Sequence, residues 1–233
     1  MEEEEVRASH LAEDSPNPVT ALRLEGEPGL RGFLHSPVEA NGSSVVLTHG
    51  AGANCESRLL MAMANAFAAA GFFVLRCDLP FRQARRFGPP SPGGAGRDRD
   101  GLRQAVVALK ERVKGAVYLS GHSYGGRQAS MLVAEEPEIV AGLLLLSYPL
   151  HPPQKPEQLR TAHFPKIRKP AFFVHGTKDG FGSIAEMKAA LKVIGGSHGL
   201  LEVDGAGHEL LKKNDTELPA RVVNEFQAFL EKS

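Results

Sequence analysis

Residues 117–131, VYLSGHSYGGRQASM, are the stretch of sequence from which the fold is best interpreted. Residues 117–119 are apolar and partly β-branched, which predicts a buried strand, and a helical run begins at Arg127. Between them lies the pattern Gly-x-Ser-x-Gly, with Ser123 at its centre. Small residues two positions before and after this serine let a strand and a helix approach closely around a sharp turn. The stretch therefore predicts a strand–turn–helix unit that exposes the hydroxyl of Ser123 at its tip.

On both sides of this unit, short apolar segments alternate with helical segments along the chain. Such alternation predicts an α/β fold, with a mainly parallel sheet that carries helices on both faces. Before the first buried strand, two loosely alternating segments separated by Glu-Pro-Gly predict an antiparallel hairpin. The expected strands are 19–25, 30–35, 45–48, 72–76, 117–119, 140–146, 171–175 and 200–203, and the expected helices are 57–70, 100–114, the run from Arg127, 183–193 and 217–232.

The chain has 233 residues, and one domain over residues 19–233 accounts for all of these elements. Residues 1–18 are acidic and end in Ser-Pro-Asn-Pro, which predicts a mobile N-terminal tail. Residues 78–99 form the longest irregular stretch, and loops of this length are usually functional or mobile. The irregular segment 148–170 has too few residues for a helical cap domain, so we expect an open site.

Composition excludes several classes of partner and cofactor. Lys+Arg and Asp+Glu both number 27, so the chain has no overall field to attract nucleic acid or an anionic membrane. No apolar run reaches the ~18 residues of a membrane helix. Met1 is followed by four glutamates, unlike a secretory signal, and two cysteines make no disulfide framework, so we expect a cytoplasmic protein. No Cys-x-x-Cys, His-Glu-x-x-His or phosphate-loop motif occurs, and we expect neither a metal nor a cofactor. The oligomeric state is left open.

The residues with catalytic chemistry fall just after predicted strands. In parallel sheets, ligand sites lie beyond the carboxyl ends of the strands, which groups Ser123, Asp179 and His208. A serine hydroxyl is a weak nucleophile that needs a base and a carboxylate to orient that base. We therefore expect His208 to be the base and Asp179 the orienting acid, with Asp204 as the alternative acid. His198 precedes a strand and is expected at the opposite end of the sheet.

An acyl-transfer site also needs N–H donors for the oxyanion. One donor is expected to be the backbone N–H of Tyr124, which follows the serine directly. The second is expected from the small-residue turn His-Gly-Ala-Gly at 49–52, with Ala51 as the donor. The histidines at positions 49 and 122 are interpreted as structural residues beside these two turns.

Four motifs together resemble the α/β-hydrolase superfamily: HGAG at 49–52, GHSYGG at 121–126, HGTKD at 175–179 and GH at 207–208. The similarity runs from about Leu22 to the C-terminus. RCDLPF at 76–81, the arginines at 85–86 and YPLHPP at 148–153 resemble a branch of small capless hydrolases. That branch is related to dienelactone hydrolases and to an animal testis-expressed hydrolase-like family. The resemblance implies a cytosolic serine hydrolase of carboxylesterase type acting on small-molecule esters, thioesters or lactones. Dienelactone hydrolases use a cysteine nucleophile, whereas position 123 is serine.

Two questions stay open at this point. Arg82, Arg85 and Arg86 follow a strand at its carboxyl end, and we expect one of them to bind an anionic group of the substrate. The alternative is that they form surface ion pairs or fix the loop. The rival to catalysis as a whole is a binding or scaffold protein that keeps the hydrolase fold without turnover.

Overall fold

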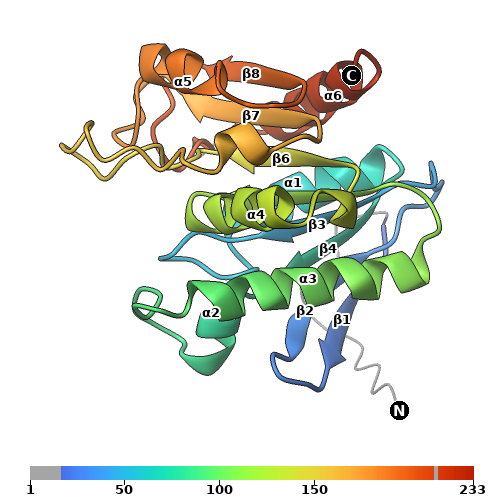
Figure 1. The fold of residues 1–233 in the computed structure, drawn as a ribbon. Helices are drawn as coiled ribbons and strands as arrows, with labels where there is room; N and C mark the ends of the chain where they lie inside the picture. Colours follow the sequence, from blue (N-terminus) through green and yellow to red (C-terminus); the bar gives the residue numbers. More distant parts are fainter. Residues whose placement is uncertain (1–16, 213–214) are drawn as a thin grey trace.

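The structure is a computed structural model that describes residues 17–212 and 215–233. The predicted mobile tail, residues 1–18, lies outside the described residues except for its last two. Within the described part, one α/β domain contains an eight-stranded sheet, with the strand order β1-β2-β4-β3-β5-β6-β7-β8. Figure 1 shows this sheet between two layers of helices.

The element bounds follow the predicted alternation closely. The strands are β1 Val19–Leu24, β2 Leu30–His35, β3 Ser44–Thr48, β4 Phe73–Cys77, β5 Val117–His122, β6 Gly142–Leu146, β7 Ala171–Gly176 and β8 His198–Val203. The helices are α1 Arg58–Ala69, α2 Pro80–Ala84, α3 Ala95–Arg112, α4 Tyr124–Glu135, α5 Ile184–Leu191 and α6 Leu218–Leu230, with short 3-10 turns at Pro137–Ile139 and Phe164–Lys166.

The sheet is parallel from β4 to β8 and antiparallel at its first edge. The predicted hairpin is confirmed, because β1 pairs antiparallel with β2, and β2 continues antiparallel against β4. Every neighbouring pair from β4 through β3 to β8 is parallel, as the near-continuous apolar strands predict.

Two apolar clusters cover the two faces of the sheet. One packs α3, α4 and α5 against the sheet, with Leu102, Leu132 and Met187 fully buried. The other packs α1 and α6 against the opposite face, around Phe67 and Phe226. In Figure 1, α3 and α4 lie in front of the sheet and α1 lies behind it. The prediction of helices on both faces is confirmed.

The prediction was wrong for the region after β4. We expected residues 78–99 to be irregular and a helix to begin at residue 100, but α2 occupies Pro80–Ala84 and α3 begins at Ala95. Gly96 and Gly101 lie near the start of α3, and because glycine is unfavourable in helices the sequence does not predict a helix there. A Cβ on Gly101 would lie 2.6 Å from the Pro80 ring, so this glycine permits the close packing of α2 on α3.

The segment between β6 and β7, residues 147–170, contains only the 3-10 turn at 164–166, so the domain has no helical cap.

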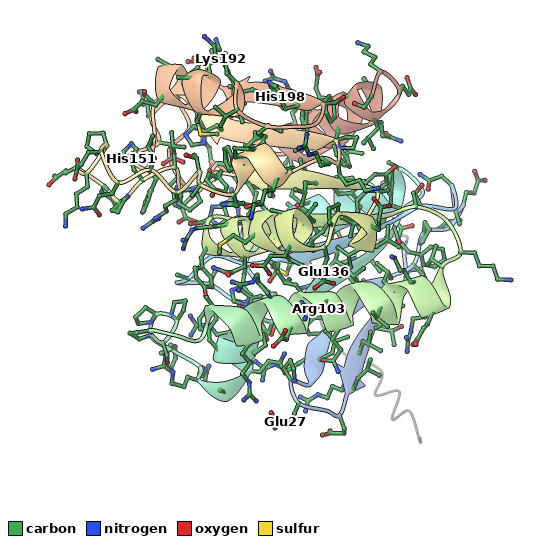
Figure 2. All side chains as sticks on the ribbon, in the orientation of Figure 1. Glu27, Arg103, Glu136, His151, Lys192 and His198 are labelled. Atoms are coloured by element: carbon green, nitrogen blue, oxygen red, sulfur yellow. The ribbon has the colours of Figure 1, made fainter. Side chains whose placement is uncertain are left out.

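Outside the sheet, ion pairs fix neighbouring helices. Arg103 on α3 binds Glu136 at the end of α4 through both of its edge nitrogens (Figure 2). Among the described residues, none of the helices combines the length and apolar character needed to cross a membrane.

Candidate active site

Ser123 occupies a strained turn between β5 and α4. Its backbone has φ 50° and ψ −116°, in a region that L-residues other than glycine seldom adopt. The conformation is held because its N–H donates to the carbonyl of Leu146 at 2.9 Å and its carbonyl accepts from the N–H of Arg127 at 3.0 Å. A Cβ on Gly126 would lie 2.6 Å from the carbonyl oxygen of Gly121. These glycines therefore let α4 start directly against the end of β5.

The three residues expected to act together lie within hydrogen-bond distance of one another. Nε2 of His208 lies 2.7 Å from Oγ of Ser123. Nδ1 of the same ring lies 2.9 Å and 3.0 Å from the two carboxylate oxygens of Asp179. With Nδ1–H donating to the carboxylate, Nε2 is free to accept the proton of the serine hydroxyl. The three side chains come from the loops after β5, β7 and β8, which meet at one edge of the sheet.

Asp179 is held in its ionised form although its side chain is fully buried. Burial by itself raises the pKa of this carboxyl, but hydrogen bonds from His208 and from the N–H of Phe181 outweigh that effect, and the pKa falls below its usual value. Nε2 of His175 lies 3.8 Å away and adds to the stabilisation. The carboxylate is therefore available to accept the hydrogen bond from Nδ1–H of His208 near neutral pH.

Two contacts that the sequence did not reveal fix the position of His208. The ring of Phe181 stacks on the imidazole, with 4.1 Å between ring centroids and 30° between planes. Nε2 of His122 lies 2.9 Å from the backbone carbonyl of His208, which makes it the donor of this hydrogen bond. Burial lowers the pKa of His122, so it is neutral and its single N–H is used here. The only signal for Phe181 was its place in the loop that carries Asp179.

The His-Gly-Ala-Gly turn lies directly against Ser123. A Cβ on Gly50 would lie 3.3 Å from the Cβ of Ser123, and one on Gly125 would lie 2.5 Å from the carbonyl of His49. His49 is buried; its Nε2 accepts from the N–H of Leu79 at 3.1 Å, and its Nδ1 donates to the carbonyl of Gly50 at 2.8 Å. Burial lowers the pKa of His49, so it stays neutral in this arrangement. The turn that carries Ala51 is therefore fixed beside the serine.

Tyr124, the other expected oxyanion donor, is fixed through its own side chain. Its hydroxyl donates to Oδ2 of Asp98 at 2.7 Å, while the other oxygen of Asp98 accepts from the N–H of Phe81. Asp98 is buried, and burial raises the pKa of its carboxyl. In the part of the chain that the structure describes, no hydrogen bond uses the backbone N–H of Ala51 or Tyr124. Both donors are therefore free for a substrate oxygen.

Arg82 is placed differently from the expectation that it binds substrate. Its side chain is buried, and all five of its N–H donors go to backbone carbonyls. Nη2 donates to the carbonyl of Ala51 at 2.7 Å and Nε donates to the carbonyl of Ala53 at 2.8 Å, so two of these bonds hold the turn beside Ser123. The other three hold the carbonyls of residues 85, 86 and 88. This guanidinium has no donor left for a substrate.

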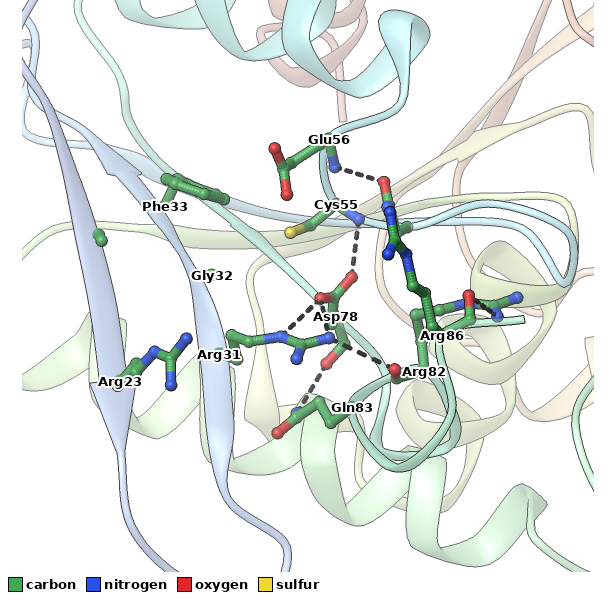
Figure 3. Close-up of a pocket in the computed structure, with 12 residues that line it drawn as sticks. Arg23, Arg31, Gly32, Phe33, Cys55, Glu56, Asp78, Arg82, Gln83 and Arg86 are labelled. Carbon is green, nitrogen blue, oxygen red and sulfur yellow. Dashed lines mark hydrogen bonds and ion pairs between the residues drawn. The ribbon is translucent and has the colours of Figure 1, made fainter. Parts of the chain in front are cut away.

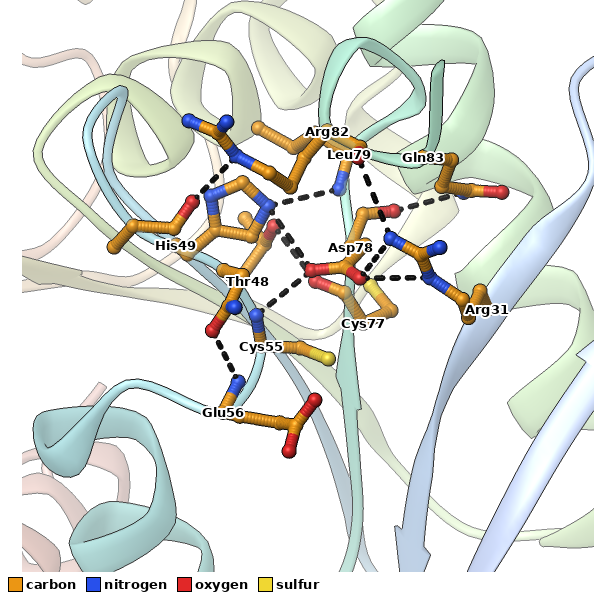
Figure 4. A network of polar contacts seen from close by, with 12 residues as sticks. Arg31, Thr48, His49, Cys55, Glu56, Cys77, Asp78, Leu79, Arg82 and Gln83 are labelled. Atoms are coloured by element: carbon orange, nitrogen blue, oxygen red, sulfur yellow. Dashed lines mark hydrogen bonds and ion pairs between the residues drawn. The ribbon is translucent and has the colours of Figure 1, made fainter. Parts of the chain in front are cut away.

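A carboxylate completes the network around the turn. Asp78 follows β4, and its Oδ1 accepts from the N–H of Cys55 at 2.8 Å, while its Oδ2 accepts from Nε of Arg31 at 2.9 Å (Figure 4). Arg76 donates to the carbonyl of Cys55 at 2.7 Å. Residues 49–55 are thus held by three charged side chains from the end of β4 and from α2.

The other two predicted arginines lie on the loop after α2. Arg85 is bound within its own loop, to the carbonyl of Pro89 at 2.7 Å and to Oγ of Ser91 at 3.0 Å. Arg86 has its guanidinium 5.2 Å from the ring centroid of Phe87. No contact of either side chain with Ser123 or His208 is found among the described residues.

The alternative residues are placed away from the serine. Asp204 accepts from the hydroxyl of Thr177 at 3.3 Å, whereas Nδ1 of His208 is bonded to Asp179. His198 begins β8 and is exposed (Figure 2). Both cysteines are buried, and burial raises the pKa of Cys77 to about 12. Among residues 17–212 and 215–233, no group of three or more His, Cys, Asp or Glu side chains is arranged to hold a metal ion.

Solved structures with this fold include several hydrolases. A dienelactone hydrolase from Anabaena variabilis is 23% identical, with a TM-score of 0.71 over 90% of this chain and 96% of that chain. Est1E from Butyrivibrio proteoclasticus is 19% identical, with a TM-score of 0.71 over 91% of this chain and 99% of that chain. A serine hydrolase without a lid from Xanthomonas campestris is 14% identical, with a TM-score of 0.67 over 95% and 98%. These similarities confirm the fold that the sequence predicts, including the absence of a cap.

The family follows from a match over most of the chain. Residues 41–228 match the model of the alpha/beta hydrolase domain, and they include Ser123, Asp179, His208 and the turn at residues 49–52. The chain therefore belongs to the alpha/beta hydrolase family.

Proposed function

We propose that this protein is a serine hydrolase that cleaves carboxylic esters of small molecules through a covalent acyl-enzyme. The observation that carries the proposal is the chain of contacts from Ser123 Oγ to His208 at 2.7 Å and from His208 to Asp179 at 2.9 Å. A backbone strained at the serine, together with a buried carboxylate whose pKa is lowered, is typical of a site built for nucleophilic catalysis.

In the first half of the reaction, Oγ of Ser123 attacks the ester carbonyl while Nε2 of His208 takes the hydroxyl proton. Negative charge then develops on the carbonyl oxygen, which accepts hydrogen bonds from the N–H groups of Ala51 and Tyr124. Asp179 stabilises the imidazolium that forms, without itself taking the proton. The tetrahedral intermediate collapses, the bond to the alcohol oxygen breaks, and His208 returns the proton to the leaving alcohol.

In the second half, water replaces the alcohol. His208 removes a proton from a water molecule as its oxygen attacks the acyl carbon, and the same two N–H groups bind the second oxyanion. Collapse of this intermediate releases the carboxylic acid and restores the serine hydroxyl. Thioesters and lactones react through the same steps because they present the same carbonyl carbon to the serine.

The substrate class is proposed from the openness of the site and from the structural neighbours. No helical cap covers Ser123, an arrangement that suits small esters better than a lid-gated lipid substrate. Est1E has been solved with ferulic acid bound, and another fold neighbour, DcsB, with a substrate analogue. These neighbours are only 18% and 16% identical to this chain, so they support small organic acyl groups as a class rather than one compound.

The test is hydrolysis of p-nitrophenyl esters of increasing acyl length by the wild-type chain, by Ser123→Ala and by Ser91→Ala. Ser91 is an exposed serine of the loop before α3 and controls for a serine substitution elsewhere. We expect turnover and fluorophosphonate labelling in the wild type and in Ser91→Ala, and neither in Ser123→Ala. A folded wild-type protein with neither activity would support the scaffold alternative, and turnover that survives in Ser123→Ala would refute the assignment of the nucleophile.

A further inference from the structure

A cavity of about 490 Å³ opens at the first edge of the sheet, outside the residues that surround Ser123. Its walls come from the β1–β2 hairpin, from residues 54–56 and from α2 and the loop after it (Figure 3). The residues that line it do not include Ser123, Asp179 or His208. This cavity is called the hairpin cavity below.

The walls of the hairpin cavity carry an excess of positive charge. Arginines 23, 31, 82 and 86 line it, against the acids Glu56 and Asp78. Arg23 on β1 and Arg31 on β2 are direct cross-strand partners, and like charges that face each other in this way destabilise a sheet. An anion bound between them would relieve this repulsion.

Several guanidinium donors in the cavity have no hydrogen-bond or ion-pair partner among residues 17–212 and 215–233. No hydrogen bond or ion pair of the Arg23 or Arg86 side chain occurs within the described part of the chain. Arg31 binds Asp78 through Nε and Nη2, and its Nη1 has no acceptor among those residues. In Figure 3, Arg23 and Arg31 project from the two strands of the hairpin, and Arg86 lies across from them.

Part of the remaining wall is apolar and aromatic. Ala21 and Phe33 are cross-strand partners next to the arginine pair, on the same face of the hairpin. The guanidinium of Arg76 lies 4.6 Å from the centroid of the Phe33 ring. The cavity therefore offers a cationic end and an apolar wall, and its volume lies within the usual range of small-molecule sites.

We propose that the hairpin cavity binds a small organic anion, a carboxylate or a phosphate ester with a short apolar body. Arg23, Arg31 and Arg86 would hold the anionic group, since guanidinium groups donate paired hydrogen bonds to carboxylate and phosphate oxygens. The apolar body would lie against Phe33. This site revises the earlier expectation for the loop arginines: Arg86 contributes with two hairpin arginines, whereas the donors of Arg82 and Arg85 are used to hold backbone and loop atoms.

The experiment is isothermal titration calorimetry at fixed ionic strength on the full chain carrying Ser123→Ala. This background separates the proposal from the proposed hydrolysis, because binding is measured in a protein that cannot form an acyl-enzyme. The probes are phenyl phosphate, benzoate and the neutral benzamide. The test variant adds Arg23→Gln and Arg86→Gln, two side chains whose guanidinium groups make no hydrogen bond or ion pair in the described structure. The control variant adds Arg221→Gln and Lys232→Gln, two exposed cations at α6 and just after it.

We expect at least one of the two anions to bind saturably, with a dissociation constant that rises tenfold or more in the test variant and stays within twofold in the control variant. Tighter binding of phenyl phosphate would assign the site to phosphate esters, and tighter binding of benzoate would assign it to carboxylates. Equal dissociation constants in the two variants, equal binding of benzamide, or no saturable binding of either anion would overturn the proposal. Circular dichroism spectra and melting temperatures of the two variants establish that both are folded.

Discussion

Replacing Arg82 by methionine tests the arrangement of the oxyanion turn. Methionine keeps the unbranched chain but removes all five donors, including the bonds to the carbonyls of Ala51 and Ala53. A buried acceptor that loses its partner costs roughly 1–3 kcal/mol, so two unsatisfied turn carbonyls predict a loss of about 2–6 kcal/mol in the free energy of unfolding. Arg82→Lys keeps the charge but has three donors, and we expect an intermediate loss.

The catalytic consequence follows from the position of the Ala51 N–H. Removing an oxyanion donor outright typically costs about 10²–10³ in kcat. Arg82→Met loosens this donor without deleting it, so we expect kcat to fall by roughly 10–10²-fold. KM should change less, because the oxyanion exists only in the transition state and the intermediates.

The assay is steady-state hydrolysis of a short p-nitrophenyl ester, with circular dichroism and denaturant unfolding of each variant. Arg85→Met is the matched control, because this arginine binds only atoms of its own exposed loop. The expected order of kcat is wild type and Arg85→Met first, then Arg82→Lys, then Arg82→Met. A folded Arg82→Met protein with kcat within twofold of wild type would refute the argument, as would equal effects of the Arg82 and Arg85 variants.

Three further predictions concern the same framework. Asp179→Asn should lower kcat by about 10⁴ with the fold intact, because an amide no longer fixes the Nδ1–H tautomer of His208, and ester hydrolysis measures it. Gly126→Ala should abolish activity or soluble expression, since its Cβ would lie 2.6 Å from a backbone oxygen, whereas Gly96→Ala on α3 meets nothing within 4 Å and should stabilise the protein by about 0.5–1 kcal/mol in thermal unfolding. Burial, with a smaller contribution from the Arg76 charge, lowers the pKa of His35 from 6.5 to about 4, so the folded state binds fewer protons than the unfolded state between these values. The stability present above pH 6.5 should therefore decline by up to about 3 kcal/mol as the pH falls to 4, and urea unfolding of His35→Gln should show a flatter profile over this interval.

The sequence predicted those features that depend on local pattern. The strand–turn–helix unit around Ser123 and the parallel sheet follow from apolar runs and from small residues at fixed spacing, and both are found. The start of α3 was missed because Gly96 and Gly101 lie in its first two turns, where glycine is an unfavourable helix residue. Gly101 is there for the packing of α2, a contact that periodicity does not encode.

The sequence left the role of Arg82 open for a related reason. Its partners at residues 51 and 53 are backbone carbonyls some thirty positions earlier in the chain. Every residue has such a carbonyl, so the residue types at these positions do not indicate that Arg82 binds there. An arginine on a loop after a strand can bind substrate or hold backbone carbonyls, and the sequence does not distinguish the two. The acceptors of its N–H groups in the structure decide between them. Phe181 was missed likewise, because its stacking on His208 depends on how the loops after β7 and β8 meet.

Two side chains join the hairpin cavity to the oxyanion turn at residues 49–55, which gives the structure a route for coupling between them. Asp78 and Arg82 both line the cavity and both hold residues 51–55. Arg31 joins them, since it donates to the carboxylate of Asp78 and to the backbone carbonyl of Arg82 at 3.3 Å. An anion that draws Arg31 toward Arg23 through its free Nη1 pulls this arginine away from Asp78, and Oδ1 of the same carboxylate accepts from the N–H of Cys55 at the end of the turn. Because coupling between two sites is reciprocal in free energy, a ligand that shifts the turn must itself bind with a different affinity once the oxyanion site is filled.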